Sequence, residues 1–129
     1  MAIIVDLEHL AGGYSVSRLP ADQPLPDWVT GPGLVNVTYA PDEISVVCRS
    51  DRVPAQTETS PSWSAIKVST KFDFDEAGVV LSVVKPISTA GLGVFVVSTF
   101  YRDYLLVRSD EFETAKRLLS DTGHRFVDV

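Results

Sequence analysis

The residues best suited to chemistry lie in one short acidic segment. Phe72-Asp73-Phe74-Asp75-Glu76 places three carboxylates within four positions. Such a cluster could hold a hard cation, but it lacks the full set of oxygen ligands found in a calcium-binding loop. Acidic side chains at the start of a helix also cap free N–H groups and oppose the positive end of the helix dipole. We favour this second role and predict no metal site.

A glycine shortly after these carboxylates could form part of a ligand-binding site. Gly78 falls in the first turn of an expected helix, where backbone N–H groups lack partners within the helix and attract carboxylates. Without a side chain, Gly78 would let a ligand approach those groups. Close packing of the helix against a sheet explains the glycine equally well. A free amino acid could place its carboxylate there and its ammonium on Glu76 or Asp103.

Residues suited to catalysis are scarce in this sequence. It has no nucleophile-elbow serine or cysteine and no glycine-rich phosphate-binding motif. We interpret His9 and His124, the two histidines, as solvent-exposed groups rather than bases held against a nucleophile. Cys48, the single cysteine, falls in an apolar run and is interpreted as buried rather than reactive. We therefore predict no catalytic residue, no enzyme activity and no cofactor.

The helix that would present Gly78 follows from the spacing of apolar residues. One helical face is predicted from five of them: Ala77, Val80, Leu81, Val84 and Ile87. Asp73 or Asp75 could cap its start, and Gly91 would end it. Pro86 lies inside this helix and predicts a kink, because proline removes a backbone hydrogen bond.

Further elements complete the second half of the chain. Alternating apolar residues predict three strands, at 63–71, 94–100 and 104–108. A second helix is expected from Asp110, with Glu113 completing a capping box. Its apolar face would hold Phe112, Ala115, Leu118 and Leu119, and Gly123 would end it before a short strand at 125–127. The predicted order is therefore β-α-β-β-α-β, the ferredoxin-like order.

The first half of the chain predicts a shorter unit. Residues 14–19, 34–39 and 44–49 are typical of strands, whereas prolines between positions 20 and 33 leave room for at most one helical turn. Residues 50–62 are the best candidate linker. A weak repeat with an offset of 60 aligns Val35–Thr38 with Phe95–Ser98, although alternating apolar residues alone would explain much of the match.

Composition excludes several classes of protein. The 129 residues carry a net charge of −6, which argues against nucleic acid as a partner. A single cysteine excludes an intramolecular disulfide. The apolar start, residues 1–10, contains Asp6 and Glu8 and lacks the basic region of a signal peptide. No uncharged apolar run is long enough to cross a membrane, so we predict a cytoplasmic protein with no membrane partner.

Two long segments resemble a known family. The run from Phe72 to Leu81 and the run from Gly91 to Val107, which contains Ser98-Thr99-Phe100 and Asp103-Tyr104, are similar to the ACT domain superfamily. Tyr14–Pro20, the proline-rich segment ending in Trp28, and Glu43–Cys48 extend the resemblance. The most similar branch holds small bacterial tandem-ACT proteins, and it is related to cytosolic arginine sensors and aspartate kinase regulatory domains.

The resemblance implies an α+β protein of two tandem ferredoxin-like (ACT, βαββαβ) units, the first abbreviated. Residues 1–60 would form the abbreviated unit with its N-terminal lead-in, and residues 61–129 the complete one. It also implies binding of a free amino acid between units. The ligand-binding residues carried over by position are Phe72, Asp73, Glu76, Ala77 and Gly78 on the backbone-recognition side, and Thr99, Phe100 and Asp103 on the side-chain side.

Three functions remain open from the sequence. The leading one is an allosteric, amino-acid-binding regulatory domain, and a homodimer is a possible assembly. The second is a non-catalytic interaction or assembly protein with a vestigial ligand pocket. An enzyme on a ferredoxin-like scaffold is the third, because a fold does not determine a function.

Overall fold

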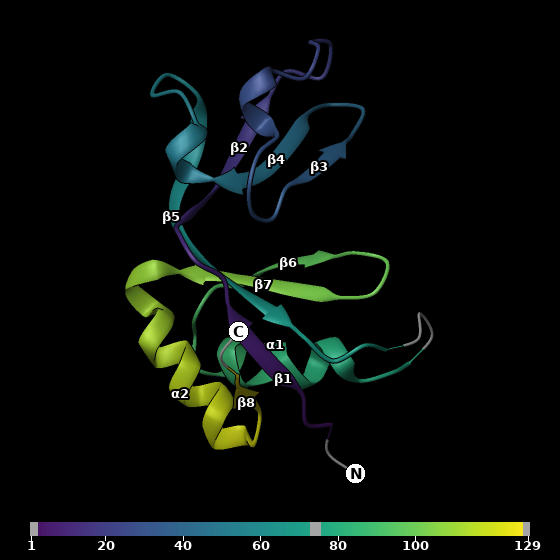
Figure 1. Cartoon of the computed structure of the whole chain (residues 1–129), viewed down its shortest axis with the longest axis vertical. Coiled ribbons are helices and arrows are strands. Elements are labelled where there is room, and N and C mark those ends of the chain that lie inside the picture. The colour runs from purple at the N-terminus through teal and green to yellow at the C-terminus, as the bar shows by residue number, and fades with distance from the viewer. Residues whose placement is uncertain (1–2, 73–75, 128–129) are drawn as a thin grey trace. The chain divides into compact units, whose positions relative to one another are not determined.

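The computed structural model describes residues 3–72 and 76–127 (Figure 1). Contacts group the chain into two compact units. We call Met1–Leu10 with Ser64–Val129 the helical unit and Ala11–Trp63 the proline-rich unit. Strand β5 (Glu58–Val68) contributes residues to both, so it runs across the boundary predicted near residue 60.

The helical unit has the predicted β-α-β-β-α-β order. Its elements are β5, α1 (Val79–Thr89), β6 (Phe95–Ser98), β7 (Asp103–Arg108), α2 (Phe112–Thr122) and β8 (Arg125–Phe126). Residues of both helices share one hydrophobic core with alternate residues of the strands, such as Ile66 and Val68. The helices therefore cover one face of the sheet, and the expected α+β, ferredoxin-like class is confirmed.

The N-terminal lead-in lies in the sheet of the helical unit. We expected it to accompany the first unit, but β1 (Asp6–His9) pairs antiparallel with β5 and parallel with β8. The strand order is β6-β7-β5-β1-β8. The physical reason is burial: Val5 and Leu7 are almost fully enclosed in the core under the two helices.

The buried face of α1 differs from the predicted one. Val79, Val83 and Ile87 are buried, whereas Val80 and Leu81 are 40% and 62% exposed. The first three helical residues, Val79, Val80 and Leu81, are all apolar and lie on different sides of the helix, so spacing alone could not select the face that packs on the sheet. Gly78 precedes the first helical residue, and the predicted caps Asp73 and Asp75 lie outside the described residues. The predicted kink at Pro86 stays a prediction.

Helix ends were predicted better than helix starts. Gly91 and Gly123 both follow a helix with positive φ, of 83° and 110°, as expected of glycines that end helices. The capping box at the start of α2 was wrong. Asp110 lies in a 3-10 turn, η3 (Ser109–Glu111), and α2 begins at Phe112 with no side-chain cap. Of its predicted apolar face, Leu118 is only half-buried.

The proline-rich unit is the abbreviated one. Its strand order is β3-β4-β2-β5, where β2 spans Tyr14–Leu19, β3 Asn36–Tyr39 and β4 Ile44–Arg49. Between β2 and β3 the only helical element is the 3-10 turn η1 (Asp27–Val29), as the prolines predicted. The Arg52 guanidinium holds this segment by donating to the carbonyl oxygens of Trp28, Val29 and Pro32 at 3.1, 3.2 and 2.9 Å.

Part of the predicted linker is a strand. β5 already begins at Glu58, although it contains Pro61. Tyr14 pairs with Trp63 but Val16 pairs with Ser60, so two residues of β5 oppose one residue of β2. Ser62, one of the two, has a φ of 68°. A bulge of this kind accommodates proline because the extra residues leave the ladder of hydrogen bonds.

The internal repeat is present with an offset of 59 rather than 60. The bounds of β3, β4 and the 3-10 turn η2 (Ser50–Arg52) each recur 59 positions later as β6, β7 and η3. The cross-strand pairs agree, because Asn36 opposes Val47 and Phe95 opposes Leu106. A shift of one residue would exchange the two faces of a strand. The predicted alignment therefore paired side chains on opposite faces.

Candidate functional site

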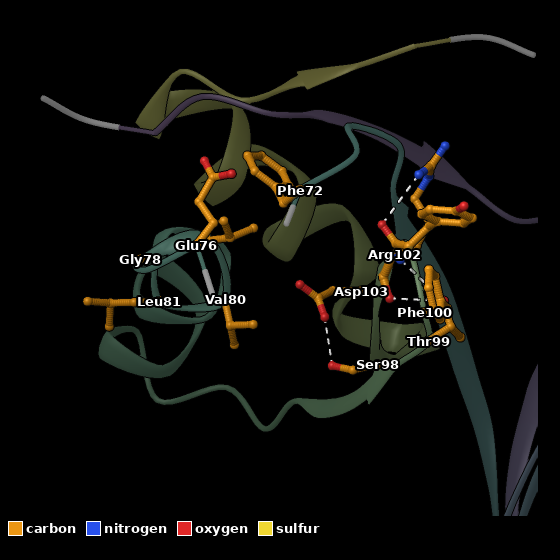
Figure 2. A pocket seen from close by; sticks show the side chains of 12 residues that line it. Phe72, Glu76, Gly78, Val80, Leu81, Ser98, Thr99, Phe100, Arg102 and Asp103 are labelled. Atoms are coloured by element: carbon orange, nitrogen blue, oxygen red, sulfur yellow. Dashed lines mark hydrogen bonds between the residues drawn. The ribbon is translucent and has the colours of Figure 1, made fainter. Parts of the chain in front are cut away.

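A cavity of about 310 Å³ lies in the helical unit, between the start of α1 and the β6–β7 hairpin (Figure 2). It is lined by six of the eight residues predicted for ligand binding: Phe72, Glu76, Gly78, Thr99, Phe100 and Asp103. Of the other two, Ala77 is exposed outside the lining, and Asp73 lies outside the described residues. The structure thus brings the two predicted groups of residues together within a single unit.

The first turn of α1 forms one wall of the cavity. The Ser82 N–H donates to the Gly78 carbonyl at 3.0 Å, which closes this turn. The N–H groups that precede Ser82 have no acceptor within a regular helix. Gly78 has a φ of 89°, and a Cβ there would lie 3.2 Å from Ile3 Cδ1. Glycine is needed here chiefly for this left-handed conformation, a reason that the sequence did not show.

Asp103 forms the opposite wall. Its Oδ1 accepts a hydrogen bond of 2.6 Å from the Ser98 hydroxyl, within the hairpin. Figure 2 shows this carboxylate pointing toward the first turn of α1. The neighbouring Arg102 guanidinium turns away and donates to the Tyr101 carbonyl at 3.3 Å. Asp103 and Arg102 therefore form no ion pair with each other.

The hairpin turn is held by Thr99. Its N–H and its hydroxyl both donate to the Arg102 carbonyl, at 2.8 and 3.1 Å. The two residues between them, Phe100 and Tyr101, are exposed and contact each other edge to face, with ring centroids 4.8 Å apart. Lys71 places its ammonium 4.4 Å from the centroid of the Tyr101 ring. An aromatic rim therefore borders a cavity whose lining includes two carboxylates, those of Glu76 and Asp103.

Comparison with known proteins identifies the family. A family model of the ACT domain matches residues 58–121, and a model of an N-terminal domain matches residues 12–56. A protein of known crystal structure from Agobacterium tumefaciens is 45% identical, covering 98% of this chain and 94% of its own, with a TM-score of 0.93. This chain belongs to the ACT domain superfamily.

More distant structures share the fold of this ACT-domain protein. A Vibrio cholerae protein, described as of unknown function and possibly a transport protein, is 18% identical with a TM-score of 0.74, covering 92% of this chain and 89% of its own. The regulatory subunit of aspartate kinase from Thermus flavus is 10% identical with a TM-score of 0.65, covering 95% and 99%. Among curated proteins, none matches the sequence.

Sequence reasoning missed several residues that line the cavity of this ACT domain. Val80 and Leu81 were assigned to the buried face of the helix but border the cavity instead. Ser98, Tyr101 and Arg102 also line it. Tyr101 and Arg102 lie between Thr99 and Asp103, and Ser98 directly precedes Thr99. This position in one hairpin was a usable signal, because a tight turn brings its flanking residues to the same place.

Only one of the two histidines is exposed as predicted. His124 is 3% exposed, so that prediction was wrong. His9 is exposed but stacks on Phe112 with ring centroids 3.8 Å apart, and partial burial, followed by the Lys116 charge, lowers its pKa. Cys48 is buried as predicted, and burial raises the pKa of its thiol. Both shifts favour the neutral form, the imidazole of His9 and the thiol of Cys48.

Within residues 3–72 and 76–127, no three His, Cys, Asp or Glu side chains lie close enough together to hold a metal ion. Over the same ranges, no helix combines the length and apolar character needed to cross a lipid bilayer.

Proposed function

We propose that this ACT-domain protein is a non-catalytic regulatory module that binds a free amino acid in the cavity between α1 and the β6–β7 hairpin. One observation carries the proposal. The Asp103 carboxylate, held by Ser98 at 2.6 Å, faces a helix turn whose first N–H groups have no acceptor within the helix. The negative Asp103 carboxylate suits the ammonium of a zwitterion. The N–H donors at the positive end of the helix dipole suit its carboxylate.

In this proposal the ligand carboxylate binds the N–H groups of Val79, Val80 and Leu81. The ammonium binds Asp103, with Glu76 as a second carboxylate beside it. Phe72 and Phe100 would contact the ligand side chain, and Thr99 would keep the hairpin turn in place. A cavity of about 310 Å³ has room for one amino acid with some of its hydration water. The predicted contributions of Asp73 and Ala77 stay predictions.

A thermal-shift screen against the twenty free amino acids tests the proposal. A ligand that binds only the folded state stabilises it by mass action, by about 2.7 kcal/mol at a concentration one hundred times its Kd. We expect at least one amino acid to raise the melting temperature in a concentration-dependent manner. If none does so at about 10 mM, which is roughly ten times a Kd of 1 mM, the proposal is wrong.

Exposed apolar side chains favour a second candidate, an assembly protein. Val80, Leu81, Phe100 and Tyr101 are all exposed, and all border the cavity. Apolar side chains grouped around a hollow often mark a contact with another protein. We infer a homodimer as the corresponding assembly. Light scattering at micromolar concentration tests it, and a strictly monomeric mass would exclude the dimer.

A further inference from the structure

His124 lies in the core of the helical unit and is held by three hydrogen bonds. It follows Gly123, which ends α2, and its backbone N–H donates to the Leu119 carbonyl at 3.2 Å. The ring Nδ1 accepts a hydrogen bond of 3.1 Å from the Val5 N–H. The ring Nε2 lies 2.9 Å from the Ser82 carbonyl oxygen.

These partners determine the protonation of the ring. A backbone N–H can only donate, so Nδ1 must be the unprotonated nitrogen. A carbonyl oxygen can only accept, so Nε2 must carry the proton and donate to Ser82. His124 is therefore a neutral imidazole in the Nε2–H tautomer. It connects the residue before β1 with the first turn of α1, two segments far apart in the sequence.

Ser82 is the residue at which the first turn of α1 closes. Its N–H donates to the Gly78 carbonyl at 3.0 Å, and its hydroxyl donates to the Val79 carbonyl at 2.6 Å. Gly78 and Val79 line the cavity. The wall that would bind the ligand carboxylate is thus joined to His124 through a single residue.

We propose that His124 is a positioning residue for the cavity, because the Nε2–H bond to the Ser82 carbonyl sets the position of the N–H groups at the start of α1. This inference rests on the proposed function in one respect, namely that the first turn of α1 binds the ligand. The side chain that fills this place in the core need only be large and compact. The donor at Nε2 takes the place of a helical one, because Pro86, four residues after Ser82, has no N–H to donate to the Ser82 carbonyl.

Two substitutions separate the two ring nitrogens. His124→Gln can place an amide N–H near the position of Nε2 and so retain the donor to Ser82. His124→Asn can place an amide oxygen near the position of Nδ1 and so retain the acceptor for Val5. Both variants remove similar ring contacts, so each serves as the control for the other.

Amide hydrogen exchange of the ligand-free full chain provides the first readout. For His124→Asn we expect exchange at Ser82 and Val83 to become about tenfold faster, with Val5 little changed. For His124→Gln we expect faster exchange at Val5, with Ser82 and Val83 little changed. Equal acceleration at both places in both variants would indicate a purely structural role and overturn the proposal.

Nitrogen NMR of the parent protein gives a test that needs no variant to fold. We expect the ¹⁵N shifts of the His124 ring to report a single Nε2–H tautomer with a slowly exchanging proton. An Nδ1–H tautomer, or an average of the two, would overturn the proposal.

Glycine is the binding probe, because it offers only the carboxylate and ammonium that the cavity wall would recognise. We expect its Kd to rise about tenfold in His124→Asn and to stay within about twofold in His124→Gln. Equal Kd changes in the two variants would overturn the positioning role. If the parent protein does not bind glycine, the proposed function is what fails for this ligand, and hydrogen exchange still decides the role of His124.

Discussion

The helical unit and the proline-rich unit carry the same hairpin but complete it differently. Each hairpin is followed by an Arg-Ser-Asp sequence, starting at Arg49 and Arg108, and by a 3-10 turn. In each, the serine of that sequence bonds to a serine on another strand of its unit, β2 in the proline-rich unit and β5 in the helical unit. The distance between hydroxyl oxygens is 2.7 Å for Ser50 with Ser15 and 3.0 Å for Ser109 with Ser64.

The two units differ in the elements that surround the shared hairpin. The helical unit places α1 before its hairpin and α2 after it, whereas the proline-rich unit has η1 and a loop held by Arg52. At the hairpin positions that correspond at an offset of 59, Asp103 is matched by Ile44, a fully buried core residue. The shared hairpin therefore supports the fold. The cavity needs a helix start and a carboxylate that only one unit has in these places.

Truncating a core side chain at matched positions of the two units should produce the largest predicted effect, a loss of folding stability. Leu105→Ala and Val46→Ala alter fully buried residues at corresponding positions of β7 and β4. We expect the free energy of unfolding to fall by about 3 kcal/mol for Leu105→Ala and about 2 kcal/mol for Val46→Ala, from lost burial and the cavities left behind. Chemical denaturation measures both.

If the units unfold as one body, both variants will show a single transition shifted to lower denaturant. If Val46→Ala instead shifts only a first transition, the proline-rich unit unfolds independently. A change below about 1 kcal/mol for Leu105→Ala would contradict the packing of the helical unit.

The carboxylate that distinguishes the units should matter for binding rather than for stability. For Asp103→Asn we expect amino-acid binding to weaken by about 2 kcal/mol, because a charge-assisted hydrogen bond becomes a neutral one. The Ser98 hydroxyl can still donate to the amide oxygen, so the ligand-free melting temperature should change little. Calorimetric titration and melting of the one variant measure both.

Ser98→Ala is the control for this prediction, because it releases the Asp103 side chain without removing its charge. We expect a smaller loss of affinity in this variant. Unchanged binding by Asp103→Asn would remove Asp103 from the site.

Replacing the glycine at the start of α1 should have an intermediate effect, on the free energy of unfolding. Gly78→Ala forces a side chain into a conformation with φ of 89° and places its Cβ 3.2 Å from Ile3. We expect a loss of about 1 kcal/mol in the free energy of unfolding. Gly93→Ala is the matched control, since that glycine has no described atom near its Cβ position and no positive φ. Equal effects of the two substitutions would show that the Gly78 conformation is unimportant.

Ligand charge should have the smallest effect. Glu76 and Asp103 give the cavity two carboxylates, and Arg102 directs its guanidinium away. We expect L-aspartate and L-glutamate to stabilise the protein less than L-asparagine and L-glutamine, by about 1 kcal/mol or less, because like charges repel across a partly solvated cavity. Paired thermal-shift titrations at equal concentration measure this, and stronger stabilisation by the acids would contradict the acidic character of the site.

Local patterns predicted much of the secondary structure of both units. The order of its elements, the glycines that end α1 and α2, and the prolines that prevent a helix between residues 20 and 33 all follow from near neighbours in the chain. The resemblance to ACT domains also placed six described residues around the cavity. The ligand-binding role of those six residues stays a prediction. The local predictions succeeded because turns and helix ends depend on residues a few positions apart.

Tertiary structure decided the rest. The apolar first turn of α1 could pack through either of two faces, and the sheet selected Val79 over Val80. The pairing of β1 with β5 and β8, the offset of 59, and the burial of His124 between Val5 and Ser82 join segments distant in sequence. No local pattern encodes such partners. Long-range pairing is selected by the free energy of the whole core, where burial and hydrogen bonds are satisfied together.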